Sequence, residues 1–300
     1  MKRNRLGASD LLVGEIGLGC MSLGTEETKA TAIIHEALEL GVNLLDTADL
    51  YDSGRNEELV GKAIRGRRSQ VVLATKVGNR RIPGQDGWVW DPSKAYILSA
   101  AKDSLKRLGT DYIDLYQLHG GTIDDPIDET IEAFEQLKRE GVIREYGISS
   151  IRPNVIREYA ARSSIVSVMN AYSIVDRRAE EEVLPLLREK GIGVIARGPL
   201  ASGALAAGRE PVKGVPDYEL AELVELRERL QELTTPERSL TQLAIRYSLS
   251  DPAVAVAIPG ASSREQLLRN VAAADSPELT AEEIEAVRRV SKANRYVQHR

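Results

Sequence analysis

The stretch Leu44-Leu45-Asp46-Thr47-Ala48-Asp49-Leu50-Tyr51 begins as an apolar run and then changes to acidic residues and a tyrosine. A buried strand is apolar and stops at a loop, so Asp46 falls where the strand should end. Chemistry in proteins is concentrated on strand ends and loops that a rigid scaffold positions. The stretch therefore predicts a buried strand with functional side chains at its carboxyl end.

Two later apolar runs end in the same way. Val71-Val72-Leu73-Ala74-Thr75 is followed by Lys76, and Tyr112-Ile113-Asp114-Leu115-Tyr116-Gln117-Leu118 is followed by His119. Counted with the acid and the tyrosine of the first stretch, four titratable side chains lie at the ends of three expected strands. Their shared position indicates that the fold brings them together.

The composition favours a cytoplasmic enzyme. The chain has 300 residues, which suits a single (β/α)8 barrel of typically ~250 residues. One cysteine, Cys20, excludes an internal disulfide and favours a reducing compartment. No apolar run approaches the ~20 residues of a membrane helix, and Glu15 with several glycines interrupts the one stretch that resembles a secretion signal. The formal net charge of -5 argues against nucleic acid and anionic membranes as partners.

Strand and helix signals alternate from residue 16 onward. The apolar segments expected to form strands are 16–20, 44–46, 71–76, 112–118, 142–148, 165–169, 192–196 and 253–258. The expected helices lie at 30–38, 54–64, 92–108, around 131–137, 153–161, around 183–187, 237–249 and 264–274. Asp91-Pro92 is expected to open the third helix, with Asp91 as its N-cap. Near-continuous apolar strands are typical of a parallel sheet covered by helices, so the pattern predicts a (β/α)8 TIM barrel, with residues 1–300 as a single domain.

Several segments lie outside the repeat. Residues 1–15 predict a small β-hairpin, and 219–232 and 280–293 predict two extra helices outside the barrel. The connections 77–91 and 198–219 are expected to be irregular, and loops of that length are usually functional.

The alternative architecture is an open doubly wound sheet. We disfavour it because Gly17-x-Gly19 lacks the third glycine of a dinucleotide fingerprint, and no acidic residue ends the second strand in a setting that would hold a ribose.

In a barrel, the carboxyl ends of all strands lie on the face where active sites sit. A buried ammonium at Lys76 is costly unless paired, and Asp46 is the available anion. The same ammonium should lower the pKa of Tyr51 from its usual ~10 and make the phenol a better proton donor. His119 could donate a directional hydrogen bond to an oxygen. Each side chain alone is more often structural, but the four together form an apparatus for protonating a carbonyl oxygen.

Protonating a carbonyl oxygen is useful when something attacks the carbonyl carbon. Because no amino-acid side chain delivers hydride, the site implies a nicotinamide cofactor. The sequence shows no Cys/His cluster of the kind that binds a metal and no nucleophile beside a base in the manner of acyl transfer, so no metal is expected.

With these residues in view, the sequence resembles the aldo-keto reductases over essentially its whole length. It looks closest to the short-loop bacterial branch, whose relatives include the potassium-channel β subunits. Each motif alone is weak, but their order and spacing are highly specific. The motifs are Gly17-Leu18-Gly19-Cys20-Met21, Asp46-Thr47-Ala48-Asp49-Leu50-Tyr51, Gly54 with Asn56-Glu57, Ala74-Thr75-Lys76, Asp114-Leu115-Tyr116-Gln117-Leu118-His119, Gly147-Ile148-Ser149-Ser150, Tyr172-Ser173, Gly198-Pro199-Leu200-Ala201-Ser202-Gly203 and Ile258-Pro259-Gly260-Ala261-Ser262.

The resemblance implies a role for each of the four titratable residues. Tyr51 would be the general acid in carbonyl reduction. Lys76, paired with Asp46, would lower the pKa of Tyr51, and His119 would orient the carbonyl.

The resemblance also implies NADP (NADPH) as the cofactor, with its carboxamide near Ser149, its pyrophosphate under 198–203 and its adenosine phosphate near 260–270. The residues implied to contact the cofactor are Gly19, Cys20, Met21, Asp46, Ser149, Ser150, Met169, Arg197, Gly198, Pro199, Leu200, Ala201, Gly203, Gly260, Ser262, Arg264, Gln266, Arg269 and Asn270.

The sequence departs from the family pattern around the cofactor and the substrate. Ser150 replaces an asparagine, Met169 a glutamine and Arg197 the aromatic residue that stacks on the nicotinamide. Gly120-Gly121 replaces Trp-Pro after the histidine, and Arg269 replaces the glutamate that binds adenine. We expect the reaction to be kept and the pocket to be reshaped.

The segment Gly260-Ala261-Ser262-Ser263-Arg264 favours NADP over NAD. It opens a helix, whose free N–H groups and partial positive charge suit a phosphate. Arg264 and Arg269 add cations with the geometry that phosphate prefers, and Asn270 is placed for the adenine edge. The alternative is that both arginines form a solvated helix face.

The substrate pocket is expected to be lined by Met21, Trp88, Trp90 and Gly120. Both tryptophans lie in the 77–91 loop, where the alternative is that they pin the loop to the barrel. Three functions compete: an NADP-dependent carbonyl reductase acting on small molecules, a cofactor-binding regulatory subunit of the channel-β type, and a barrel lyase or isomerase. We favour the first, as a monomer or weak homo-oligomer.

Overall fold

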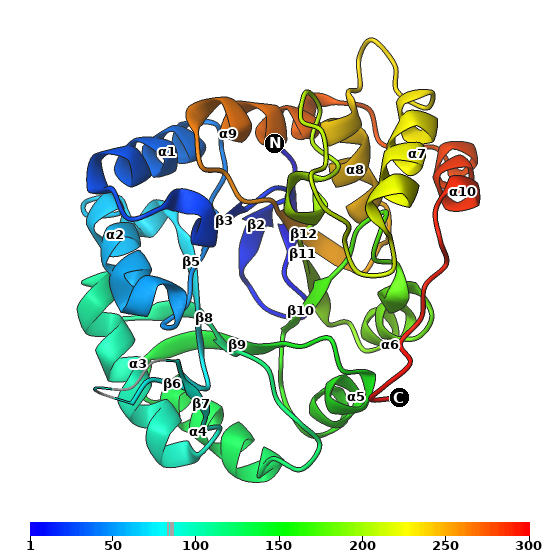
Figure 1. Cartoon of the computed structure of the whole chain (residues 1–300). Coiled ribbons are helices and arrows are strands. Elements are labelled where there is room, and N and C mark those ends of the chain that lie inside the picture. The colour runs from blue at the N-terminus through cyan, green and yellow to red at the C-terminus, as the bar shows by residue number, and fades with distance from the viewer. Residues whose placement is uncertain (83, 85–86) are drawn as a thin grey trace.

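The protein is described by a computed structural model that covers residues 1–82, 84 and 87–300. Eight parallel strands form one sheet in the order β3-β4-β5-β8-β9-β10-β11-β12 (Figure 1). The strands are β3 (Leu18–Gly19), β4 (Leu44–Asp46), β5 (Val72–Val77), β8 (Ile113–Leu118), β9 (Ile143–Ser149), β10 (Ser167–Ala171), β11 (Gly193–Arg197) and β12 (Val254–Ile258). Parallel bridges from Ile16 to Ala257 and from Gly19 to Gly260 join the two edges of the sheet. The predicted TIM barrel is confirmed.

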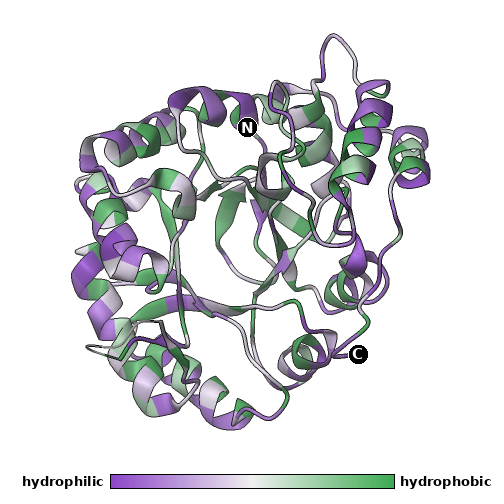
Figure 2. Ribbon diagram, viewed as in Figure 1, coloured by the Kyte–Doolittle hydropathy of each residue, from purple (hydrophilic) through white to green (hydrophobic). Residues whose placement is uncertain are grey.

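Ten α-helices occur in the described chain, and they surround the strands (Figure 1). Those that follow the barrel strands are α1 (Glu27–Glu39), α2 (Arg55–Ala63), α3 (Lys94–Leu108), α4 (Ile127–Arg139), α5 (Pro153–Arg162), α6 (Val183–Glu189), α8 (Leu240–Ser248) and α9 (Arg264–Val271). The two predicted extra helices, α7 (Leu220–Gln231) and α10 (Ala281–Val290), contact each other outside the barrel. Figure 2 shows apolar residues along the strands and polar residues on the outer sides of the helices. Across the part of the chain that the structure describes, every helix is too short or too polar to cross a bilayer.

The start of α3 differs from the prediction. Ser93, and not Asp91, is the N-cap, because its hydroxyl accepts a hydrogen bond from Tyr96 N. Asp91 instead accepts hydrogen bonds from both the amide and the hydroxyl of Ser93. Both residue types cap helices well, and the helix begins at the second of the two. Gly109 ends it in left-handed backbone (φ 61°), as expected.

The amino-terminal hairpin closes one end of the barrel. Strands β1 (Arg3–Arg5) and β2 (Leu12–Gly14) pair in antiparallel fashion, as predicted. Leu6, Leu11 and Val13 of this hairpin pack in one apolar cluster with inward side chains of the barrel strands. This end is therefore filled with side chains, and ligands must reach the barrel from the carboxyl ends of its strands.

The two long connections differ in regularity. The first, expected to be irregular, contains a short antiparallel pair, β6 (Asn79–Arg80) and β7 (Val89–Trp90); residues 83, 85 and 86 of this loop lie outside the described residues. The second begins with left-handed backbone at Gly198, Ala201, Ser202 and Gly203. Left-handed backbone costs a residue with a Cβ atom about 1–2 kcal/mol, and such strain is found mostly at functional sites.

Candidate active site

Three polar side chains share the inward face of neighbouring strands at the open end of the barrel. They are Asp46 on β4, Lys76 on β5 and Gln117 on β8. Side chains two positions apart on a strand point to the same side. The residues two positions earlier all belong to the apolar cluster inside the barrel: Leu44, Ala74 and Leu115. The alternation of each strand therefore places the three polar groups directly above the barrel interior.

Lys76 is the centre of the site. Its side chain is fully buried, and its Nζ lies 2.7 Å from Asp46 Oδ2, 2.7 Å from the carbonyl oxygen of Thr47 and 3.2 Å from the hydroxyl of Tyr51. An ammonium carries three N–H bonds, and each has an acceptor here. The ion pair expected from the sequence is present.

The charge on Lys76 is maintained by its neighbours. Burial acts to lower the pKa of Lys76, but the Asp46 carboxylate and the Tyr51 oxygen outweigh burial and raise it. Burial also favours the neutral form of Asp46, and this is opposed by Lys76 and by Gln117 Nε2, which lies 3.4 Å from Asp46 Oδ1. With a 2.7 Å contact between opposite charges, we describe the two groups as a charged pair.

Tyr51 begins a 3-10 helix, Tyr51–Gly54, in which Asp52, Ser53 and Gly54 all have positive φ. The expectation that Lys76 lowers the pKa of Tyr51 below its usual value is wrong for the net effect. Burial raises the pKa of Tyr51, and the opposing effect of Lys76 is smaller. Tyr51 therefore remains a protonated phenol at neutral pH. The adjacent ammonium makes loss of that proton less costly than it would be in an apolar pocket.

His119, which directly follows β8, is the fourth residue of the predicted site, with Asp46, Tyr51 and Lys76. Its ring meets the ring of Tyr51 edge-on, with centroids 5.9 Å apart and an interplanar angle of 84°. Burial, assisted by the charges of Lys76 and Arg197, lowers the pKa of His119 to about 3, so the imidazole is neutral near pH 7. Its Nδ1 is buried and has no hydrogen-bond partner among the described residues. A neutral imidazole can donate a hydrogen bond to an oxygen without transferring a proton.

The structure brings together two further groups that the sequence reasoning missed. Gln117 supports Asp46, and the strand alternation that starts at Leu115 could have revealed it. Asn170 donates from Nδ2 to the carbonyl oxygen of Ser150 at 2.8 Å and accepts from the hydroxyl of Tyr296 at 3.3 Å. That second contact joins residues far apart in the sequence, so no local pattern could have indicated it.

We use the name basic rim for four arginines: Arg197 at the end of β11, Arg209, and Arg264 and Arg269 of α9. Arg209 and Arg269 lie along the backbone of the 198–208 segment: a Cβ atom at Gly203 would lie 2.9 Å from Arg209 Nη1, and one at Gly208 would lie 3.8 Å from Arg269 Nη1. A Cβ at Gly198 would meet no atom within 4 Å, so this part of the loop is open. Arginines beside an open, glycine-containing loop suit the phosphates of a dinucleotide.

Residues 15–292 match the family described as the Aldo/keto reductase family. The chain belongs to the aldo/keto reductase family.

Relatives of this oxidoreductase match it along its whole length. A Bacillus subtilis (strain 168) protein, "Uncharacterized oxidoreductase YqkF", is 57% identical over 307 residues, covering 100% of both chains. The holo form of aldo-keto reductase AKR11C1 from Bacillus halodurans is 59% identical with a TM-score of 0.95, covering 100% of this chain and 99% of that one. An aldo/keto reductase from Klebsiella pneumoniae, in complex with NADP and acetate, is 30% identical with a TM-score of 0.77, covering 98% of each chain.

The predicted cofactor contacts fall into two groups in the reductase. Some side chains are buried within the protein: Cys20 Sγ contacts the carbonyl oxygen of Leu18, Met169 belongs to the apolar cluster inside the barrel, and Asn270 Nδ2 donates to the carbonyl oxygen of Gly260. Asn270 therefore holds the loop at Gly260 in place through its amide nitrogen. Other predicted contacts lie around the barrel closure, where Gly19 bridges Gly260.

The arginines expected to bind phosphate already have carboxylate partners. Arg264 Nη2 lies 2.7 Å from Glu36 Oε1, and Arg269 Nη2 lies 2.5 Å from Glu265 Oε1. Both arginine side chains are largely exposed, so these pairs are weak and can be exchanged for a stronger anion. Gln266, which lies between them in the sequence, accepts hydrogen bonds from the amide and hydroxyl of Ser262.

Trp90 packs against the loops that follow β5 and β8. Its indole Nε1 donates to Asp125 Oδ1 at 2.9 Å. A Cβ atom at Gly78 would lie 2.5 Å from the indole, and one at Gly120 would lie 3.3 Å from it. The two glycines therefore make room for the ring against the ends of β5 and β8. Of the other residues predicted to line the pocket, Met21 and Trp88 are 64% and 52% exposed.

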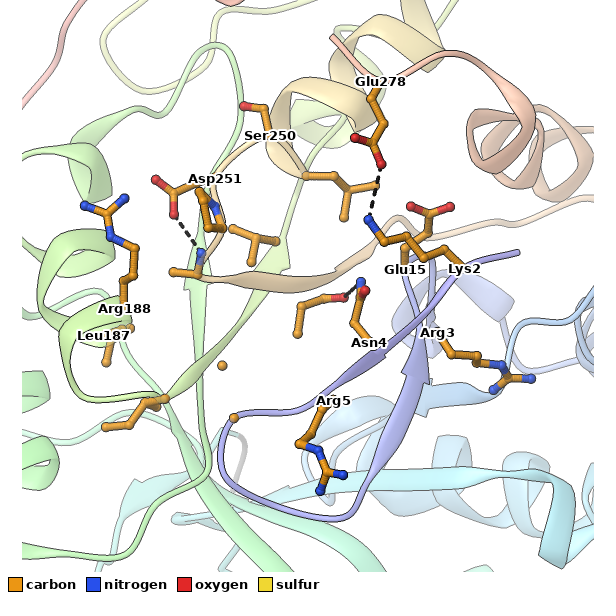
Figure 3. Close-up of a pocket in the computed structure, with 18 of the residues that line it drawn as sticks. Lys2, Arg3, Asn4, Arg5, Glu15, Leu187, Arg188, Ser250, Asp251 and Glu278 are labelled. Atoms are coloured by element: carbon orange, nitrogen blue, oxygen red, sulfur yellow. Dashed lines mark hydrogen bonds and ion pairs between the residues drawn. The ribbon is translucent and has the colours of Figure 1, made fainter. Parts of the chain in front are cut away.

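A separate hollow of about 660 Å³ lies at the opposite end of the barrel, beside the hairpin (Figure 3). Four of its charged groups pair with one another, in the contacts of Lys2 with Glu278 at 3.2 Å and of Arg246 with Glu15 at 2.9 Å. Active sites of this fold sit at the carboxyl ends of the strands, so we assign no catalytic role to this hollow. Among the described residues, no group of three or more His, Cys, Asp or Glu side chains is arranged to hold a metal ion.

We predict that Lys76→Met destabilises the fold. The substitution leaves Asp46 buried without its counter-ion, and breaking a buried pair in this way costs about 3–5 kcal/mol. The free energy of unfolding, measured by urea denaturation, should fall accordingly, and the double variant Asp46→Asn/Lys76→Met should recover part of the loss. The matched control is Lys106→Met, because Lys106 pairs with Asp103 on the surface. Equal stabilities of Lys76→Met and Lys106→Met would contradict the prediction.

Proposed function

We propose that this chain reduces aldehydes or ketones to alcohols with NADPH, and that Tyr51 donates the proton. The observation that carries the proposal is the buried ammonium of Lys76, which contacts both Asp46 and the Tyr51 hydroxyl beside a neutral His119. The carbonyl carbon gains a hydride and its oxygen gains the phenolic proton. One carbonyl, one NADPH and one proton thereby become one alcohol and one NADP⁺.

Each side chain has one task in this reaction. Tyr51, which burial keeps protonated, presents its hydroxyl hydrogen to the substrate oxygen. Lys76 stabilises the negative charge that develops on the phenol as the proton leaves. Asp46 keeps Lys76 charged, Gln117 supports Asp46, and the tyrosine regains its proton from solvent after the step.

His119 orients the substrate oxygen. Its imidazole is neutral, so it does not compete with Tyr51 as a proton donor, and its ring lies edge-on to the phenol. A hydrogen bond from the imidazole would hold the carbonyl within reach of the Tyr51 hydroxyl. Correct placement of reacting groups is itself a large part of catalysis.

The basic rim supports NADP(H) as the cofactor, as does the NADP complex of the Klebsiella pneumoniae relative. When bound, the reduced nicotinamide supplies the hydride. Ser149 and Ser150 at the end of β9 would hold its carboxamide, and the loop 198–203 would bind the pyrophosphate. Arg264 and Arg269, on helix α9, would bind the adenosine phosphate by exchanging their carboxylate partners for it.

We place the substrate between His119 and the indole of Trp90. Gly120 directly follows His119 and contacts the same indole, so the ring forms a flat apolar wall next to the reacting carbonyl. Met21, an exposed residue that follows β3, would line the pocket at the mouth of the barrel. The arrangement favours carbonyl compounds with a planar apolar group.

Turnover of a nitrobenzaldehyde tests the assignment of Tyr51. We predict that Tyr51→Phe lowers kcat by about 10²–10⁴, the usual contribution of general acid catalysis, while the Kd for NADPH changes little because the ring remains. The control is Tyr112→Phe, whose ring lies between Arg68 and Arg144 at the start of β8. Unchanged turnover in Tyr51→Phe would refute its role. Tight NADPH binding by the wild type without reduction of any carbonyl would favour the regulatory-subunit alternative.

The rim arginines should determine the choice between NADPH and NADH. We predict that Arg264→Ala and Arg269→Ala each weaken NADPH binding about tenfold, the scale of one charge-assisted hydrogen bond, and leave NADH binding unchanged. Fluorescence titration of both reduced cofactors measures this. Glu265→Gln is the matched control, because it frees Arg269 and should keep or improve NADPH affinity. Equal affinity of the wild type for the two cofactors would overturn this placement of the phosphate.

Steady-state kinetics test the proposed wall. We predict that Trp90→Ala raises KM for aromatic aldehydes about three- to tenfold, as expected from the loss of one aromatic contact, with a smaller change for acetaldehyde. Trp90→Phe keeps a ring but loses the hydrogen bond to Asp125, and should fall between. Val89→Ala, a change at the neighbouring exposed position, is the control. If KM for all aldehydes stays constant in Trp90→Ala, the indole only anchors its loop.

A further inference from the structure

Two threonines lie directly beside the members of the buried ion pair in the sequence. Thr47 follows Asp46, and Thr75 precedes Lys76. Because successive side chains of an extended chain point to opposite sides, the two charges face the barrel interior and the two hydroxyls face the helices that cover it. Both threonines are fully buried, so their hydroxyls need hydrogen-bond partners within the protein.

The partners of these hydroxyls are consecutive residues in the first turn of α2. Thr47 Oγ1 donates to Asn56 Oδ1 at 2.7 Å, and Thr75 Oγ1 donates to Glu57 Oε1 at 2.6 Å. Both acceptors are themselves fully buried. One turn of one helix therefore holds the ends of the two strands, β4 and β5, that carry the ion pair.

Asn56 also reaches the end of a third strand. Its Nδ2 donates to the carbonyl oxygen of Cys20, which directly follows β3, at 2.9 Å. A carbonyl oxygen only accepts hydrogen bonds, so this contact fixes the orientation of the amide and leaves Oδ1 to receive the Thr47 hydroxyl. Asn56 therefore joins α2 to the ends of both β3 and β4.

Glu57 is held from its other side by helix α3. Its Oε2 accepts a hydrogen bond from Arg107 Nε at 2.6 Å, which gives the buried carboxylate a counter-ion. A Cβ atom at Gly54 would lie 2.8 Å from Arg107 Cδ. Gly54 ends the 3-10 helix that Tyr51 begins, so the same arginine packs against the segment that carries the phenol.

The hydrogen bond to Asn56 bears on Lys76 through the backbone of Thr47. The amide of Thr47 donates to the carbonyl oxygen of Ala74 at 2.9 Å, and its own carbonyl oxygen accepts from Lys76 Nζ at 2.7 Å. The hydroxyl contact adds a third point of attachment. Lys76 therefore meets an acceptor that is fixed in place, and this helps to keep its ammonium against the Tyr51 hydroxyl.

Resting on the proposed function, we propose that Asn56 and Glu57 are positioning residues of the reaction. Because both are fully buried, they act on the chemistry without touching a ligand. Through the two threonine hydroxyls they fix the strand ends so that the Lys76 ammonium stays against the Tyr51 hydroxyl. Loss of either contact slows proton donation and leaves ligand binding in place.

The test removes one hydroxyl at a time and measures kcat and KM for a nitrobenzaldehyde and Kd for NADPH. Thr47→Val and Thr75→Val keep the shape of the side chain and lose the hydrogen bond. We expect each to lower kcat about 10–100-fold, the scale of misplacing a reacting group by about 1 Å, while KM and Kd stay close to their wild-type values. Thr47→Ser and Thr75→Ser keep the hydroxyl and should keep most of kcat.

Thr130→Val is the matched control. Thr130, on α4, is also fully buried, and its hydroxyl donates to the carbonyl oxygen of Pro92 at 2.8 Å. Its loss should lower the midpoint of urea unfolding much as Thr47→Val does, with kcat close to wild type. Wild-type kcat in both Thr47→Val and Thr75→Val, an equal fall of kcat in Thr130→Val, or an equal fall in the serine variants would overturn the inference.

A stability cycle separates this inference from the proposed function. The loss of unfolding free energy on Thr47→Val is measured in the wild type and in Asp46→Asn/Lys76→Met. If Thr47 and Lys76 are coupled, the two losses differ, because contacts that share a partner are not additive. Equal losses would overturn the inference. A wild type that reduces no carbonyl refutes the proposed function, and the cycle still decides whether Asn56 acts on Lys76 through Thr47.

Discussion

One buried ammonium organises the open end of this barrel. Lys76 donates its three N–H bonds to three groups at the end of β4 and in the loop after it. These are the Asp46 carboxylate, the backbone carbonyl of Thr47 and the Tyr51 phenol. A buried charge tolerates no missing partner, so the strand end, the loop and Tyr51 are held in one arrangement. The same constraint that stabilises the fold here also sets the position of the Tyr51 hydroxyl, the proton donor that we propose.

Most of the architecture was predictable from the sequence. Periodicity located the eight barrel strands, the two extra helices and the hairpin, because burial of one face imposes a regular pattern on the residues. The exceptions have local causes. At the start of α3, Asp91 and Ser93 are both competent caps, and the choice depends on the chain path after β7. The β6–β7 pair spans only two residues on each side, which is too short to leave a periodic signal.

The residues of the candidate site could be predicted from the sequence, whereas their pKa values and ion-pair partners could not. Asp46, Tyr51, Lys76 and His119 could be found because each follows an apolar run, and strand ends converge in a barrel. The pKa of Tyr51 could not be predicted, since it depends on the balance between burial and a neighbouring charge, and only three-dimensional packing defines that balance. Likewise, Arg264 forms an ion pair with Glu36, which belongs to a helix near the other end of the chain. The sequence around residue 264 therefore could not predict this pair.

The hairpin under the barrel has a consequence for how the ligands enter and leave. Because Leu6, Leu11 and Val13 fill the amino-terminal end of the barrel, cofactor and substrate must both enter through the opening at the carboxyl ends of the strands. When two ligands bind through one opening and one of them lies beneath the other, their order of binding is not random. In the proposed reaction, a cofactor that lies beneath the substrate would have to enter first and leave last. The apolar side chains that close the amino-terminal end of the barrel would then dictate an ordered kinetic scheme.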